Sequence, residues 1–242
     1  MSQIEFTTGE IRPIECVKEA WDAIKADYWP LLAISIVGAL IGAVSLYVLI
    51  GAMVCGIFKS YLRVIDGGKA DFEDLKAGLK YFRASLLTTV LFVLPIVVYM
   101  LGLFVTLYLP LLTRTVSGQI ADGSDLLAGF GVALGVEIVI AVVMVCIHTL
   151  LIFAFPLIVD KDLSSWDAIR LSARAAMRNA GGIGGLLVVN LVLVIVGYLA
   201  CCIGLYLVIP IITASGLVAY RKVFPGPAVR SDSPPPSAYE IN

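Results

Sequence analysis

The stretch that decides the fold is PLIVDKDLSSWDAIR, residues 156–170, which leaves an apolar run and enters a charged helix. The run is uncharged up to Val159, and Asp160 begins the polar segment. The last part repeats an earlier stretch, because Trp21-Asp-Ala-Ile-Lys25 matches Trp166-Asp-Ala-Ile-Arg170 and each copy leads into an apolar run. This echo predicts a protein built from repeated modules.

The composition indicates a membrane protein. Hydrophobic residues make up 60% of the chain and charged residues 14%, whereas globular proteins average about 45–50% and about 25%. Several apolar runs exceed about 18 residues, the length of a membrane span. No basic stripe with interleaved aromatic residues is present, so we expect no nucleic-acid partner. The predicted fold class is all-α, a polytopic membrane helical bundle.

Each module is predicted to consist of an interfacial amphipathic helix followed by a membrane hairpin. This gives about six transmembrane helices and three interfacial helices in one membrane domain, residues 14–223, with modules at about 14–66, 71–159 and 164–223. Asp71 is the predicted N-cap of the second interfacial helix, and Ser164 opens a capping box for the third. Residues 1–13 are expected to be a cytoplasmic segment and residues 224–242 a disordered, proline-rich cytoplasmic tail.

Two interpretations of the first apolar run compete. Residues 30–66 form either one long tilted helix or a hairpin of about 30–46 and 49–66. The later run, 183–220, is too long for one span and is expected to break at Cys201-Cys-Ile-Gly204. Ile50 stands 159 positions before Ile209, and Tyr61 stands 159 positions before Tyr220. The shared spacing favours the hairpin.

The middle module is predicted to have one span at about 86–111, kinked at Pro95, and a second within 127–159. Residues 112–125 are expected to form a polar loop. The second run is longer than a bilayer requires, so it is expected to tilt or to extend beyond the lipid.

Basic residues set the predicted orientation. Of the 17 Lys and Arg residues, only Arg114 lies outside the segments that six spans place on one side. The positive-inside rule then puts both termini in the cytoplasm of a bacterial inner membrane. A five-span arrangement would put Arg12, Lys18 and Lys25 outside, which fits the rule less well.

Three polar residues within predicted spans are candidates for an intramembrane site. Glu137 and His148 are eleven residues apart and lie on nearly the same helix face, so a proton or ion path is one hypothesis. The alternatives are that Glu137 lies near the outer interface and that His148 is a neutral residue hydrogen-bonded between helices. Asn190 is expected to form a hydrogen bond between helices.

The third interfacial helix carries Arg170, Arg174 and Arg178 on one face, where they are candidate contacts for anionic lipid headgroups. The alternative is that they are ordinary cytoplasmic charge. Trp21 and Trp166 are the predicted interfacial anchors. No nucleophile elbow, HExxH motif or phosphate-binding loop is present, and the cysteines lack metal-binding spacing. We therefore expect no catalytic site, cofactor or metal.

Phe155-Pro-Leu-Ile-Val-Asp160 and Trp166-Asp-Ala-Ile-Arg170-Leu-Ser172 resemble a poorly characterised group of bacterial polytopic membrane proteins. That group is similar to the membrane domain fused to some glycerophosphodiester phosphodiesterases. The resemblance covers most of residues 14–223 and continues at the positions Gly67-Gly68, Asp74-Leu75, Ile203-Gly204, Pro210 and Tyr220-Arg221. It implies a polytopic inner-membrane protein. The phosphodiesterase domain is absent, so no catalytic residue carries over, and segment 97–127 departs from the family pattern.

Two functional hypotheses follow. The first is a non-enzymatic membrane protein that acts as a scaffold, an accessory subunit or an organiser of lipid. Its expected partners are membrane lipids, with a protein partner or a homo-oligomer as further options. The second is a small-solute or ion transporter or channel that uses the interface between repeats.

Overall fold

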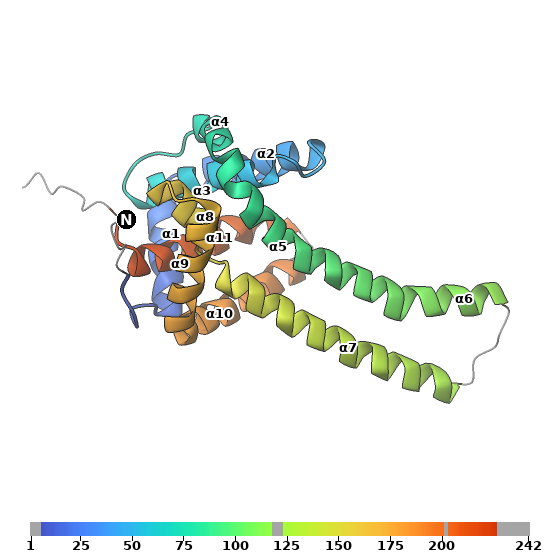
Figure 1. Cartoon of the computed structure of the whole chain (residues 1–242). Coiled ribbons are helices and arrows are strands. Elements are labelled where there is room, and N and C mark those ends of the chain that lie inside the picture. Colours follow the sequence, from blue (N-terminus) through green and yellow to red (C-terminus); the bar gives the residue numbers. More distant parts are fainter. Residues whose placement is uncertain (1–5, 118–122, 201–202, 227–242) are drawn as a thin grey trace, which may run out of the picture.

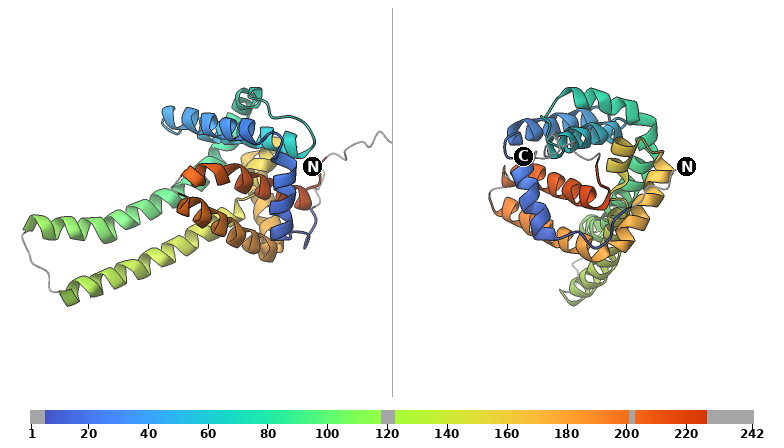
Figure 2. Two further views of the ribbon diagram at one scale, coloured as in Figure 1. Left: turned by 180° about the vertical axis from the view of Figure 1, so that it is seen from behind. Right: turned by 90° about the vertical axis from the view of Figure 1, so that its left-hand side faces the viewer.

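The computed structural model describes residues 6–117, 123–200 and 203–226, and every regular element in these ranges is a helix (Figure 1). The helices form a base at one end and three hairpins that extend from it towards the same side (Figures 1 and 2). The base is defined as four short helices together with the hairpin ends that meet them. These helices are α1 (Pro13–Ile24), α4 (Glu73–Gly78), α8 (Ala154–Lys161) and α9 (Ser165–Arg178). The predicted all-α class is confirmed.

The first hairpin pairs α2 (Tyr28–Val44) with α3 (Ile50–Ile65). The chain reverses at Leu46 and Tyr47, whose φ angles of 52° and 64° lie in the left-handed region. A Cβ atom at Gly38 would come within 2.9 Å of Ile57 Cδ1, so this glycine lets the two helices approach closely. Of the two interpretations of residues 30–66, the structure has the hairpin and not the single long helix.

The second interfacial helix is shorter than predicted. Its N-cap is Phe72 and not Asp71 as predicted. Asp71 stands one residue earlier, and its side chain accepts a hydrogen bond from the Glu73 N–H at 2.9 Å. However, α4 ends at Gly78, and a Cβ atom there would collide with the Ala52 carbonyl oxygen. α4 lies directly on α3, and the helical chain continues from it through the short 3-10 helix η1 (Leu79–Tyr81) into the next long helix.

The middle hairpin is the longest (Figure 1). Its first arm consists of η1 (Leu79–Tyr81), α5 (Phe82–Leu103), the π-helical turn η2 (Phe104–Tyr108) and α6 (Leu109–Ser117). Its second arm is α7 (Gly123–Leu150). The prediction of a polar loop from residue 112 is wrong as far as Ser117. The hydroxyls of Thr113 and Ser117 donate to the carbonyls of Pro110 and Thr113, so these polar residues are satisfied within a helix. Residues 118–122 of the predicted loop lie outside the described ranges.

A break at Leu151–Phe153 separates α7 from α8, where the sequence predicts an uninterrupted apolar run. Ser172 of α9 holds this break from both sides. Its hydroxyl donates to the Leu150 carbonyl at 2.7 Å and accepts from the Phe153 N–H at 3.1 Å. A buried backbone N–H or C=O group without a partner is costly in free energy. The Ser172 hydroxyl lowers that cost at the helix break, because it pairs with one backbone group on each side. The run therefore changes direction as it enters the base.

The third hairpin pairs α10 (Ala180–Leu199) with α11 (Ile203–Val223). Ser164 is the N-cap of α9 as predicted, and its hydroxyl accepts from the Asp167 N–H at 3.3 Å. The Asp167 carboxylate accepts from the Ser164 hydroxyl at 2.7 Å, so the described bonds form only one half of a capping box. The two tryptophan motifs differ in position, because Trp21 lies in the last turn of α1 while Trp166 is the second residue of α9. The two matching motifs therefore occupy different positions in their helices. Cys201, Cys202 and residues 227–242 lie outside the described ranges.

Aromatic side chains fill the centre of the base. Tyr220 and Phe153 are fully buried and their ring centroids lie 6.0 Å apart, with Phe224 packed against both. The N-terminal segment closes this core, since the Thr7 N–H donates to the Val223 carbonyl at 2.9 Å. The beginning and end of the described chain therefore meet at the base.

Four helical segments in the described ranges are long and apolar enough to cross a membrane, namely Glu73–Arg114, Gly129–Lys161, Ala180–Leu199 and Gly204–Val223. A fifth is obtained if α1 and α2, which meet at 98°, count as one broken span. With 17 and 16 residues, α2 and α3 are at the short limit for a span. The chain is therefore a membrane protein with several candidate spans.

Single-cysteine labelling should place the two ends of the molecule on opposite sides of the membrane. Cys16 is an unsuitable probe, because it is fully buried and burial raises the pKa of its thiol. Lys69→Cys in the base and Ser117→Cys at the tip of α6 both introduce exposed thiols into a cysteine-free background. A membrane-impermeant maleimide should label Ser117→Cys in intact cells and Lys69→Cys only after lysis. Equal labelling of both from outside would contradict the arrangement.

Candidate functional site

The ends of all three hairpins meet at one guanidinium group, that of Arg221. Its Nε and Nη2 donate to the two carboxylate oxygens of Asp66 at 2.9 and 2.6 Å, and its Nη1 lies 2.9 Å from Asp160 Oδ1. The Tyr220 hydroxyl donates to the other Asp160 oxygen at 2.8 Å. We call Asp66, Asp160, Tyr220 and Arg221 the Arg221 cluster.

The cluster forms because each contributing apolar helix ends at the same level. Asp66 follows the last residue of α3, Asp160 is in the last turn of α8, and Arg221 is in the last turn of α11. The side chains of Arg221 and Asp160 are only 13% and 9% exposed. Removing one partner of such a pair leaves a buried charge uncompensated, which costs about 3–5 kcal/mol. The cluster is therefore a structural tie between the hairpins.

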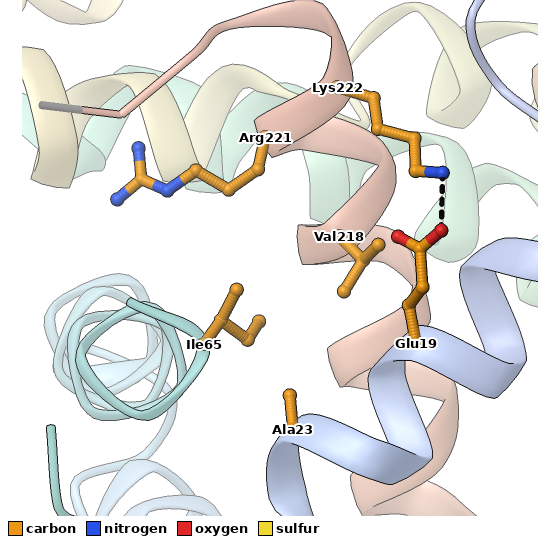
Figure 3. A pocket seen from close by; sticks show the side chains of 6 residues that line it. All are labelled: Glu19, Ala23, Ile65, Val218, Arg221 and Lys222. Atoms are coloured by element: carbon orange, nitrogen blue, oxygen red, sulfur yellow. Dashed lines mark hydrogen bonds and ion pairs between the residues drawn. The ribbon is translucent and has the colours of Figure 1, made fainter. Parts of the chain in front are cut away.

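A small cleft lies beside the cluster (Figure 3). It has a volume of about 270 Å³ and is lined by Glu19, Ala23, Ile65, Val218, Arg221 and Lys222. Lys222 Nζ lies 2.8 Å from Glu19 Oε1, and this ion pair forms one wall of the cleft (Figure 3). The Arg221 side chain points away from the ion pair (Figure 3) and binds Asp66. Small-molecule sites typically occupy about 300–1,000 Å³, and the charged groups here are already paired. The cleft offers little free binding capacity.

A second group of charges fastens α4 to α3. The Asp74 side chain is 1% exposed, and its Oδ1 lies 2.7 Å from Arg63 Nη2 and 3.4 Å from Lys59 Nζ. Arg63 also contacts Asp71 at 3.2 Å. These ion pairs hold α4 against α3. One of the two Asp74 carboxylate oxygens, Oδ1, is paired with cations.

The three predicted lipid-contact residues share one exposed side of α9. Arg170, Arg174 and Arg178 are all exposed, while residues on the opposite side, such as Ala168 and Ala175, are buried. The Arg170 guanidinium lies 4.6 Å from the Trp166 ring centroid, a cation–π contact. Among the ion pairs of the described residues, none involves these three arginines.

The two predicted aromatic anchors are half exposed. Trp166 stands at the exposed edge of α9, and Trp21 packs edge-on against Tyr28 with ring centroids 5.8 Å apart. Both residues therefore belong to the base, where an amphipathic ring can lie between apolar and polar surroundings.

Glu137 is buried at the contact between α7 and the first arm of the middle hairpin. It is 4% exposed, and its Oε1 lies 2.7 Å from the Thr106 hydroxyl of η2. Gly102 provides the space, since a Cβ atom there would come within 3.2 Å of the same oxygen. The residue is thus inside a helix interface and not at an exposed end of α7.

His148 also faces α5, but at a different level. Its Nε2 lies 3.0 Å from the Phe92 carbonyl oxygen, and its Nδ1 lies 2.8 Å from that of Met144. The predicted shared face is observed, yet no described hydrogen bond or ion pair joins Glu137 and His148. The structure does not bring them into one site.

Asn190 forms the predicted bond between helices, because its Oδ1 accepts from the Ser215 hydroxyl of α11 at 3.1 Å. The chain contains GxxxG sequences that start at Gly38, Gly131 and Gly181, and their glycines have different surroundings. Gly38 packs against α3 and Gly185 against Pro13, whereas Gly131 and Gly135 have open space where a Cβ would be. Two of the sequences therefore contribute to internal packing.

The sequence analysis missed the Arg221 cluster and the Ser172 contacts. A signal for the former existed, since Tyr220-Arg221 and Asp160 were both recognised as ends of apolar runs. Within the described residues, no group of three or more His, Cys, Asp or Glu side chains is arranged to hold a metal ion. The carboxylates Asp66, Asp74 and Asp160 at the base are each paired with a cation and contribute to packing.

Comparisons with protein-family models, with curated proteins and with solved structures find no match to this chain. The resemblance to the phosphodiesterase-associated membrane domain therefore stays a prediction. Function has to be inferred from the contacts and exposed surfaces described above.

Replacing Arg221 with alanine should destabilise the protein by about 3 kcal/mol, because Asp160 would then be a buried carboxylate that has lost its guanidinium partner. Thermal unfolding in mild detergent, followed by tryptophan fluorescence, measures this change. Lys222→Ala is the matched control, since its partner Glu19 is half exposed and exposed pairs contribute about 0–1 kcal/mol. Equal effects of the two substitutions would contradict the role of the cluster.

Proposed function

We propose that this chain is a bacterial inner-membrane protein without catalytic activity that gathers anionic lipid at its cytoplasmic base. In this proposal it has six spans and both termini in the cytoplasm. The supporting observation is the exposed side of α9, where three arginines stand one turn apart and make no ion pair within the described chain.

The spacing of these arginines supports this assignment. Arg170, Arg174 and Arg178 lie on one side of a single helix, whereas the other exposed basic residues without a described ion pair, Lys18, Lys69, Lys76 and Arg83, come from separate segments. A guanidinium presents a planar set of donors that matches a phosphate group. Basic residues at an anionic membrane surface contribute about 1 kcal/mol each. Three together would enrich anionic lipid by about a hundredfold.

Native mass spectrometry of the detergent-purified protein tests the proposal with mixed phosphatidylglycerol and phosphatidylcholine. The wild-type protein should retain phosphatidylglycerol selectively, and replacing all three arginines with glutamine should lower that selectivity more than tenfold. The matched control replaces Lys18, Lys69 and Lys76, three exposed basic residues at the same end, with glutamine. It should keep most of the selectivity. A wild-type protein with no preference, or equal losses in both variants, would refute the proposal.

Transport by the interface between hairpins is the second candidate, and the burial of Glu137 inside an apolar hairpin favours it. Purification in mild detergent separates it from the first. A homo-oligomer of uniform size that passes solute in liposomes supports transport, whereas lipid selectivity without flux supports the organiser.

A further inference from the structure

The contact between η2 and α7 contains a carboxyl group whose hydrogen bonds can be counted. Thr106 Oγ1 lies 2.7 Å from Glu137 Oε1 and 2.8 Å from the carbonyl oxygen of Gly102. A threonine hydroxyl has one proton to donate, and a carbonyl oxygen can only accept. The hydroxyl cannot donate to both neighbours at once.

Only one state of Glu137 places a proton in each of these short contacts. If the carboxyl group is ionised, either the Glu137 contact or the Gly102 contact brings two acceptors together without a proton. If the carboxyl group is protonated, its O–H donates to Thr106 and the hydroxyl donates to Gly102, as a helical threonine commonly does. The geometry thus favours the neutral acid.

The surroundings of Glu137 point the same way. Its Oε2 is buried and has no hydrogen-bond partner, and no described ion pair includes it. The titratable or charged residues of α5, η2, α6 and the part of α7 whose side chains are described are Tyr99, Tyr108, Arg114, Cys146 and His148, with Arg83 at the base end of α5. None of them forms a described hydrogen bond or ion pair with Glu137. An isolated buried carboxylate is very costly, whereas a neutral acid is not.

A π-helical turn and a cleft lie next to the Glu137 carboxyl group. A π-helical turn interrupts the first arm at Phe104–Tyr108, and such turns occur frequently at functional sites. A cleft of about 270 Å³ lies between α6 and α7, lined by Thr106, Leu107, Pro110, Leu111, Arg114, Gly129, Phe130 and Ala133. Thr106 borders it directly, and Ala133 is one helical turn before Glu137. The cleft therefore leads to the partner of the acid.

We propose that Glu137 is a proton-binding site inside the middle hairpin. It holds its proton against Thr106 in the resting protein and is accessible from the cleft between α6 and α7. This goes beyond the lipid-organising function and does not depend on it, because the site and the arginine side of α9 share no residue.

Labelling with dicyclohexylcarbodiimide tests the proposal in proteoliposomes of the full chain. This apolar reagent adds a protonated carboxyl group across one C=N bond. The acid proton moves to nitrogen and the acyl group then transfers to form a stable N-acylurea. Peptide mass spectrometry should find Glu137 modified at least tenfold more than Asp74 or Asp160, which are buried but ion-paired. A water-soluble carbodiimide should not show this preference.

Infrared spectroscopy gives a second measurement that does not require the reagent to reach the site. Wild-type protein at neutral pH should show the carbonyl stretch of a protonated carboxylic acid, and the Glu137→Gln variant should lack it. Asp74→Asn is the matched control and should leave the band in place. A wild-type spectrum without the band would overturn the proposal, and so would a band that survives in Glu137→Gln. Labelling spread evenly over all carboxylates would overturn access from the cleft.

Discussion

The fold depends on the guanidinium group of Arg221. Apolar helices gain little by leaving lipid for one another, so the association of membrane hairpins needs specific packing or polar contacts. Arg221 ends the third hairpin, and its two carboxylate partners end the first hairpin and the second. This side chain therefore joins the ends of three apolar units at one point. Other base contacts each join two segments: Asp74 with Arg63 fastens α4 to α3, and Lys222 with Glu19 fastens α11 to α1.

This arrangement divides the polar residues into two groups with different roles. At the base, several carboxylates meet cations and are used in packing, and the exposed side of α9 carries three arginines without a described ion pair. In the middle hairpin, Glu137 and His148 have hydroxyl and carbonyl partners instead of opposite charges. The α7–α8 segment connects the two environments, and Ser172 controls its change of direction at the boundary.

The sequence predicts those features that depend on neighbouring residues. The α9 cap at Ser164 is a local pattern, and the reversal near Leu46 follows from the length of the apolar run. The bond made by Asn190 follows from the cost of leaving an amide unpaired between helices. Features that join distant segments are harder to predict. Arg221 and Asp66 are 155 positions apart, and an excess of positive charge at one end does not reveal which carboxylate each cation meets. The matching tryptophan motifs mislead because four shared residues can occupy different turns of two helices.

A double-mutant cycle across the Arg221 cluster tests this account most directly. Asp160→Asn should destabilise the wild-type protein, because it removes a partner of a buried guanidinium. In an Arg221→Met background, which keeps a long apolar side chain, the same Asp160→Asn change should be less destabilising, since Asp160 has then already lost its guanidinium partner and keeps only Lys161 and Tyr220. Unfolding measured in the same detergent gives the coupling free energy, expected at about 1–3 kcal/mol. An equal effect of Asp160→Asn in both backgrounds would show that the cluster does not hold the hairpins together.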